Sequence, residues 1–312
     1  ARHAHARRLS RCVHSMIDFL PPDVRSRLKG LRLVTRRAVG GQGIGLHQSH
    51  SRGVGLEFAQ YRAYERGDEP RQIDWKLYGR SDKFFVREAE RESPVSVWIL
   101  MDTSASMAQA DSGRPDWSRL DAAKALTQGM AELALSQGDR FGWAALSDQG
   151  LKLLAPAAGT RQRDRLLLEL LPLRGGGGFA LEDQLSPIWE RIGARDLVVV
   201  LSDCFDPGVV EFMERLAGAG REVLAIEMLT LDEREFSFRG GHRFRDPETG
   251  EELIGDGPAL RAEFLRRFAE AREALHARLD RAGIRHTEHV LDQPIDRPLR
   301  RLFGAHGAAE YA

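Results

Sequence analysis

Residues 95–107 read VSVWILMDTSASM, and this stretch decides the fold. The apolar run that ends at Met101 is almost continuous, which is typical of a strand buried on both faces of a parallel sheet. It leads directly into the pattern Asp-x-Ser-x-Ser at Asp102, Ser104 and Ser106. Because open α/β sheets bind ligands at the carboxyl ends of their strands, the motif predicts a functional site at that edge.

Further along the chain, apolar strands alternate with helices. Residues 197–201 form a second buried run, which is followed by Ser202 and Asp203, and residues 222–229 form a third. This alternation predicts an α/β fold with a doubly wound, mostly parallel sheet. We expect four parts, namely a basic helix or tail over 1–30, a segment packed on the core over 31–92, the α/β core over 93–231, and a hairpin, a long helix and a last strand over 232–312.

Two helix starts can be identified from local signals. Pro21 and Pro22 open a helix that we expect to reach about Ala38. Ser118, followed three residues later by Asp121, has the spacing of a capping box and predicts a helix to about residue 137.

Composition excludes few functions. The chain has 46 Lys and Arg residues against 46 Asp and Glu residues, so global charge does not indicate nucleic acid or membrane as a partner. Its two cysteines, Cys12 and Cys204, suggest no disulfide framework and favour a reducing, cytoplasmic location. No apolar segment reaches the roughly 20 residues that span a bilayer. The Arg- and His-rich start is interpreted as a surface helix or tail rather than a transit peptide.

Four oxygen-bearing side chains are predicted to meet at the sheet edge: Asp102, Ser104, Ser106 and Asp203. Carboxylate and hydroxyl oxygens suit Mg²⁺ or Mn²⁺, and with two carboxylates the ion keeps positions for water or an external carboxylate. The alternative is that Asp102 caps the following loop and the serines bind backbone groups.

Other polar residues are candidate sites. The segment from Arg52 to Arg87 mixes basic and aromatic residues, but nearby acids almost balance it, so internal ion pairs are favoured over nucleic-acid binding. Within and near this segment, four residues are candidates for partner binding: Arg62, Arg71, Asp74 and Trp75. Three histidines lie among charged residues and are expected at the surface: His242, His286 and His289.

The motif resembles the metal-ion-dependent adhesion site of von Willebrand factor A domains. Upstream strings resemble the bacterial family called domain of unknown function 58, and they are Gly53–Phe58, Tyr61–Tyr64, Gly67–Trp75 and Val86–Glu88. The resemblance implies a von Willebrand factor A-like fold with an N-terminal family-specific segment and a C-terminal helical extension. Genes of this family often lie beside AAA+ ATPases of the MoxR type, which implies a protein partner of that type.

One departure from the resemblance concerns the second metal loop. Where the family often has Gly-Gly-Thr-Asp, this chain has glycines through Gly178 and then Phe179. The ion would lose one hydroxyl ligand, which implies weak Mg²⁺ binding.

We therefore expect a divalent-cation-assisted protein–protein interaction module that works in complex assembly or in a chaperone-like role. A binding protein is favoured over an enzyme because spacing identifies no positioned base or nucleophile. The alternative is a hydrolase or a nucleic-acid-associated factor that uses the rim formed by Asp102 and Asp203. The sequence leaves the oligomeric state open.

Overall fold

The computed structural model describes residues 18–33, 58–64, 73–89 and 96–304, and the chain divides into two compact units. Residues 1–41 and 95–312 form the larger unit, and residues 42–94 form the smaller one. The sequence-based expectation that residues 31–92 pack on the core stays a prediction.

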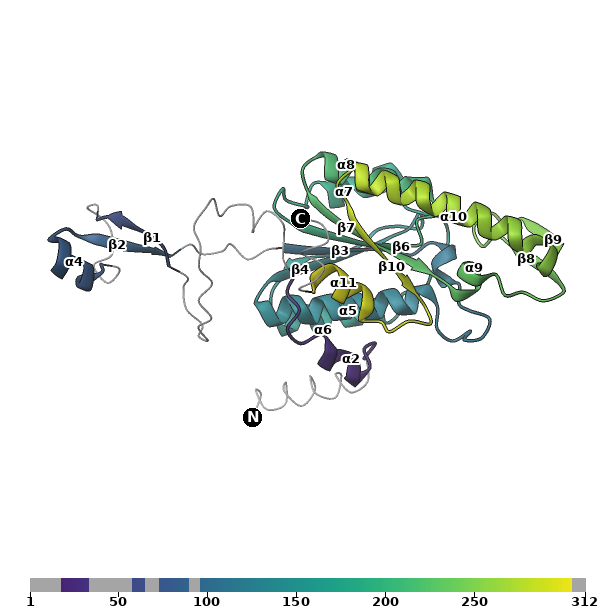
Figure 1. Ribbon diagram of the computed structural model, residues 1–312, viewed down its shortest axis with the longest axis horizontal. Helices are drawn as coiled ribbons and strands as arrows, with labels where there is room; N and C mark the ends of the chain where they lie inside the picture. Colours follow the sequence, from purple (N-terminus) through teal and green to yellow (C-terminus); the bar gives the residue numbers. More distant parts are fainter. Residues whose placement is uncertain (1–17, 34–57, 65–72, 90–95, 305–312) are drawn as a thin grey trace. The chain divides into compact units, whose positions relative to one another are not determined.

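The larger unit is built on a six-stranded sheet with the order β10-β7-β6-β3-β4-β5 (Figure 1). The strands are β3 (Ser96–Asp102), β4 (Arg140–Leu146), β5 (Lys152–Ala157), β6 (Leu197–Ser202), β7 (Glu222–Leu229) and β10 (Arg285–Val290). All neighbouring pairs are parallel except β4 and β5, which are antiparallel. The predicted doubly wound, mostly parallel sheet is confirmed.

Strand β3 is at the centre because both of its faces are apolar. Val97, Ile99 and Met101 belong to one buried cluster, and Trp98 and Leu100 belong to the other. Successive side chains of a strand point to opposite faces, so one apolar run supplies two cores. The nearly continuous pattern of the sequence is thereby explained, and it fixes where Asp102 emerges.

Helices cover both faces of the sheet (Figure 1). One cluster packs under α2 (Pro22–Arg27), α5 (Arg119–Gln137), α6 (Thr160–Leu170) and α11 (Arg297–Phe303). The other cluster packs under α7 (Glu182–Trp189), α8 (Pro207–Gly218) and α10 (Gly257–Arg281). The start of α5 is the predicted one, because Ser118 and Asp121 form the capping box reciprocally.

The N-terminal helix is shorter than predicted. It begins at Pro22 but ends at Arg27, well before the expected Ala38. Gly30 follows with a φ of +93°, a left-handed conformation that turns the chain. Residues beyond Leu33 lie outside the described part of the chain. Val24 and Leu28 are buried in the core of the larger unit, so this helix is part of that core.

The C-terminal part returns to the same sheet. After β7 come α9 (Leu231–Glu235), a hairpin of β8 (Gly241–Arg245) and β9 (Glu252–Asp256), and then α10. Strand β10 pairs in parallel with β7 and becomes the edge of the main sheet, so the sheet extends past residue 231. None of the helices within the described ranges is long and apolar enough to cross a membrane.

One expected surface histidine is buried. His289 on β10 is 0% exposed, whereas His242 and His286 are partly exposed. The sequence-based expectation for His289 was wrong because charged neighbours along a strand point alternately to opposite faces. His289 faces inward while Glu288 next to it lies against α10, where it pairs with Arg272.

The smaller unit contains the antiparallel pair β1 (Phe58–Ala63) and β2 (Phe85–Ala89), together with α4 (Trp75–Ser81). Tyr78 stacks on Phe84 with ring centroids 4.5 Å apart. Trp75 lies edge-on to both of these rings. These aromatic contacts join the helix to the strand pair within this unit.

Candidate functional site

The first residue of the site is Asp102, which ends β3 and is 1% exposed. Its Oδ1 accepts a hydrogen bond from the backbone N–H of Ser104 at 2.9 Å, and its Oδ2 accepts one from the Ser202 hydroxyl at 2.6 Å. The first bond is the loop-capping contact of the alternative interpretation. Each carboxylate oxygen keeps a further lone pair, so capping and ion binding are compatible.

The two serines of the motif are brought together. Ser104 precedes the short 3-10 helix η2 (Ala105–Ala108), and Ser106 lies within it. Their hydroxyl oxygens are 3.0 Å apart and both side chains are buried. Adjacent ligands of an octahedral Mg²⁺, each about 2.1 Å from the ion, are about 3.0 Å apart. The separation fits a hydrogen bond and also fits two ligands of one ion.

Asp203 joins the group from the end of β6. Its Oδ1 accepts from the backbone N–H of Phe205 at 3.3 Å. Burial raises the pKa of the Asp203 carboxyl, while the Arg119 guanidinium and the Ser106 hydroxyl act to lower it. Burial, reinforced by the nearby Asp203 carboxylate, raises the pKa of Asp102 to about 6. The four sequence-predicted site residues therefore lie together at the carboxyl ends of β3 and β6.

Sequence analysis missed Arg119, the first residue of α5, which is completely buried beside the site. Its guanidinium donates to the Asp203 carboxylate at 3.0 Å, to the backbone carbonyl of Ser106 at 2.9 Å, and to Glu233. A cation in the first turn opposes the helix dipole, so it needs acidic partners. An arginine directly after the helix-capping Ser118 was therefore the signal that the sequence offered.

The donor set fits a small hard cation. It consists of oxygen atoms only, and the buried guanidinium of Arg119 pairs with Asp203 and Glu233 and not with Asp102. Within the described ranges no group of three or more His, Cys, Asp or Glu residues is arranged to hold a metal. An ion here therefore depends on the serine hydroxyls and on water, as Mg²⁺ readily does.

The glycine loop 175–178 lies against the motif by backbone contact. Gly176 donates its N–H to the carbonyl of Thr103 at 3.0 Å, and Ala105 donates to the carbonyl of Gly177 at 2.8 Å. A Cβ on Gly175 would stand 2.9 Å from the Ser104 carbonyl oxygen, so this position needs glycine. The loop is where the sequence analysis placed it, and it brings no side-chain hydroxyl.

Two C-terminal segments bear on the rim, which is the group of side chains at the carboxyl ends of β3 and β6. Helix α9 is tied to the loop after η2, because Asp232 accepts from the backbone N–H of Ser112 and its own N–H donates to Asp111. Partial burial raises the pKa of Glu248 in the turn between β8 and β9, and the charge of Asp203 adds to this rise. The contacts of helix α9 could not be read from the sequence, since each joins residues more than a hundred positions apart.

The four candidate partner-binding residues belong to the smaller unit. Asp74 caps α4, because its carboxylate accepts from the backbone N–H groups of Lys76 and Leu77. Trp75 is 59% exposed. Arg62 lies on β1 opposite Val86, and Arg71 lies outside the described residues. A role of these residues in partner binding stays a prediction.

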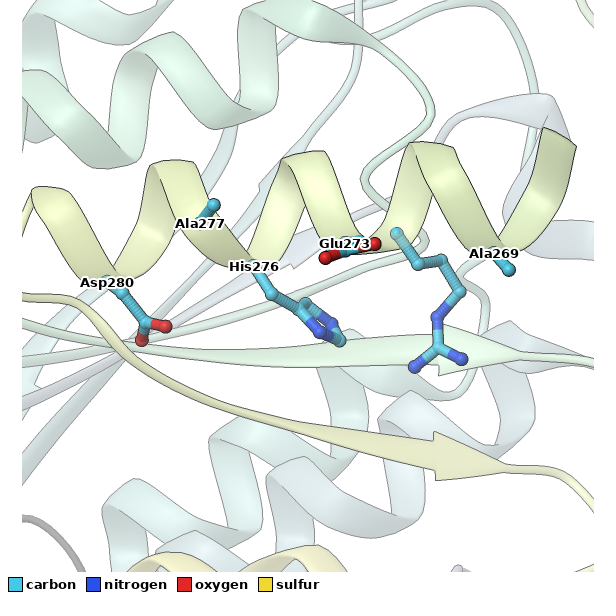
Figure 2. Close-up of a pocket in the computed structure, with 6 residues that line it drawn as sticks. Ala269, Glu273, His276, Ala277 and Asp280 are labelled. Atoms are coloured by element: carbon cyan, nitrogen blue, oxygen red, sulfur yellow. The ribbon is translucent and has the colours of Figure 1, made fainter. Parts of the chain in front are cut away.

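A hollow along α10 is the second candidate region (Figure 2). Arg272 bonds Glu227 at 3.2 Å and also pairs with Glu288, and His276 lies 3.0 Å from Glu227. These side chains pair across the helix and the strands beneath it, and Glu273 and Asp280 also line the hollow. Arg272, Glu288 and His276 are each partly exposed, so water screens the charges of this region.

The strand order and the Asp-x-Ser-x-Ser loop at its carboxyl edge define an α/β protein of the von Willebrand factor A-like class. The chain belongs to the family described as "Protein of unknown function DUF58", which matches residues 60–274.

Individual proteins resemble the chain in sequence or in fold. An uncharacterized protein of Mycobacterium tuberculosis is 29% identical over 82% of this chain and 81% of its own length. Among solved structures, the conserved hypothetical protein BatB from Bacteroides thetaiotaomicron aligns with a TM-score of 0.41 and 13% identity, over 70% of this chain and 98% of that one. The SpRpn10 VWA domain aligns with a TM-score of 0.38 and 12% identity, over 67% and 95%.

Proposed function

We propose that this protein is a divalent-cation-assisted protein–protein interaction module. Asp102, Ser104, Ser106 and Asp203 would hold Mg²⁺, and the ion would bind a carboxylate of the partner. The observation that carries the proposal is the convergence of these buried oxygens at the ends of β3 and β6. An ion-bound carboxylate adds a directional, charge-assisted contact to an interface.

The neighbouring thiol supports binding over covalent catalysis. Cys204 follows Asp203 directly and adopts a φ of +59°, an uncommon conformation for this residue type. Burial and the surrounding carboxylates raise the pKa of its thiol well above the usual value. A thiol held in its protonated form is a poor nucleophile.

The charge of the rim bears on the nucleic-acid alternative. Acidic residues gather there, among them Asp203, Asp206 and Glu248. A phosphate backbone binds proteins through Lys and Arg, and it would be repelled by this group of carboxylates. The rim is therefore better suited to a cation than to a nucleic acid.

We propose a MoxR-type AAA+ ATPase as the partner, in complex assembly or a chaperone-like setting. This choice rests on the gene neighbourhood of the family, and the cytoplasmic location likewise stays a prediction. The direct experiment is a pull-down of the MoxR-type ATPase from the native host, in Mg²⁺ and in EDTA. Binding that is lost in EDTA and with Asp102→Asn is the expected result.

Controls separate the alternatives. Leu168→Ala replaces an exposed side chain of α6, outside the motif and the glycine loop, and serves as the surface control. Equal capture of the ATPase in Mg²⁺, in EDTA and with Asp102→Asn would remove the ion from the interaction. Hydrolysis of a substrate by the purified protein, abolished by Asp102→Asn, would replace the binding function with the hydrolase alternative.

A further inference from the structure

The smaller unit presents aromatic rings at its surface. Trp75, the first residue of α4, is 59% exposed, and Phe84, which directly precedes β2, is 45% exposed. Tyr78 of α4 stacks on Phe84 with the ring planes 14° apart, and the Trp75 ring stands at 80° and 89° to these two rings. The three rings touch one another, so they form one apolar surface and not scattered single exposures.

Backbone contacts fix the position of these rings within the unit. The Asp74 carboxylate caps α4 by accepting from the backbone N–H groups of Lys76 and Leu77 at 2.9 and 3.1 Å. The N–H of Asp74 donates to the carbonyl of Phe85 at 2.9 Å, which joins the start of α4 to β2. A surface that is already ordered loses little conformational entropy when a partner binds, so the arrangement favours docking.

Three exposed cations border the rings, and they are Lys76, Arg80 and Lys83. Lys76 and Arg80 are four positions apart in α4, so they lie on the same side of the helix. None of the three forms an ion pair with another residue in the described ranges. Between residues 73 and 86 the exposed acid is Asp82, because Asp74 is buried. The surface around the rings therefore carries an excess of positive charge.

We propose that this face of the smaller unit docks an acidic protein segment that carries an apolar side chain. The apolar side chain would pack on the rings, and carboxylates on either side of it would pair with the cations. Charge complementarity selects an acidic partner, and exposed aromatic residues supply most of the energy at such interfaces. The aromatic-basic face consists of Trp75, Tyr78, Phe84, Lys76, Arg80 and Lys83.

A protein segment fits the aromatic-basic face better than a nucleic acid does. Single strands stack successive bases on separate ring faces along a basic groove. Tyr78 and Phe84 stack on each other, so the ring faces between them are not open to a base. The exposed carboxylate of Asp82 lies between Arg80 and Lys83 in the sequence and disfavours a continuous phosphate backbone.

The direct test uses the full chain in EDTA, so that no metal ion contributes to binding. The probe is a fluorescein-labelled synthetic peptide in which one phenylalanine is flanked by glutamates, and fluorescence anisotropy gives its dissociation constant. Trp75→Ala should weaken binding about tenfold, because a central aromatic contact is lost. Ile254→Ala, which truncates a side chain of the larger unit that is 73% exposed, is the matched control and should leave the constant unchanged.

The charges are tested separately. Lys76→Gln combined with Arg80→Gln should weaken peptide binding several-fold and reduce its dependence on salt, because salt screens exposed ion pairs. This double variant keeps the three rings, so it tests the aromatic-basic face even if Trp75→Ala disturbs the fold of the unit. Lys152→Gln, which removes an exposed lysine of β5, is the matched control.

Three results would overturn the proposal. The first is no measurable binding of the peptide, or equal affinity in the wild type, in Trp75→Ala and in the double variant. The second is tighter binding of an oligothymidylate single strand than of the peptide, which would assign the face to nucleic acid. The third is protection of Trp75 from hydroxyl-radical oxidation in the full chain alone, which would show that the chain itself covers the rings. Because the tests are made in EDTA, their failure leaves the proposed cation site standing.

Discussion

The rim at the ends of β3 and β6 and the hollow along α10 both gather charged side chains, but the rim is buried more deeply than the hollow. In the hollow, Arg272 is shared between Glu227 and Glu288, and His276 adds a further contact to Glu227. At the rim, Arg119 is the buried cation among several carboxylates. The difference teaches that the number of charges is a poor guide to function, because water screens an excess of carboxylates at the surface, whereas the same excess in a buried place favours a counter-ion.

The largest expected effect comes from removing the rim's guanidinium. Arg119→Met would leave the buried Asp203 and the partly buried Glu233 without their cation and should lower the free energy of unfolding by about 3–5 kcal/mol. Arg272→Met in the partly exposed hollow should cost about 1 kcal/mol. Urea denaturation of both variants measures the contrast. Similar losses in the two variants would contradict the distinction between the two regions.

The strand that borders the hollow provides the next test. Burial, aided by the nearby charge of Arg297, lowers the pKa of His289 to about 4, and its ring nitrogens have no hydrogen-bond partner among the described residues. Its ordinary value is about 6.5. The unfolded chain therefore takes up a proton before the folded chain does. Stability should be complete above pH 6.5 and should fall by about 3 kcal/mol as the pH drops to about 4.

The control for this pH dependence is His289→Leu, which has no titrating ring. Unfolding free energies measured between pH 4 and 7 should fall less steeply in this variant than in the wild type. The same slope in both proteins would show that other groups cause the dependence.

A smaller effect on stability is expected from neutralising one carboxylate of the rim. Asp102→Asn removes a charge that is buried next to Asp203, so in EDTA at neutral pH it should raise the free energy of unfolding by about 1–2 kcal/mol. It should also abolish the stabilisation that Mg²⁺ gives the wild type, about 1.4 kcal/mol at ten times the dissociation constant. Thermal unfolding with and without Mg²⁺ checks both. Persistent Mg²⁺ stabilisation of the variant would place the ion elsewhere.

The smallest effect concerns the glycine loop. A Cβ at Gly178 would lie 3.6 Å from the Asp148 carboxylate, an ordinary contact, so threonine fits there. Gly178→Thr should tighten Mg²⁺ binding several-fold by supplying a hydroxyl in place of water. Gly176→Thr, where the nearest contact to a Cβ is also 3.6 Å, is the matched control for calorimetry. Equal gains at both positions would mean that the hydroxyl acts nonspecifically.

The sequence by itself determined the sheet and the location of the candidate site. A strand buried on both faces needs a nearly continuous apolar run, and the residues that follow it must emerge at the sheet edge. Both properties are local, so β3, β6 and the loop from Asp102 to Ser106 could be predicted. The capping box at Ser118 was predicted for the same reason, because its partners are three residues apart.

Only the tertiary structure decided what surrounds the site. Arg119 meets Asp203, and Asp232 meets Ser112, across sequence separations that carry no periodic signal. The position of His289 depended on which face of β10 turns inward, and charged neighbours on a strand do not reveal that. The sequence shows which side chains are charged, but which of these charges pair depends on distances that exist only after the chain has folded.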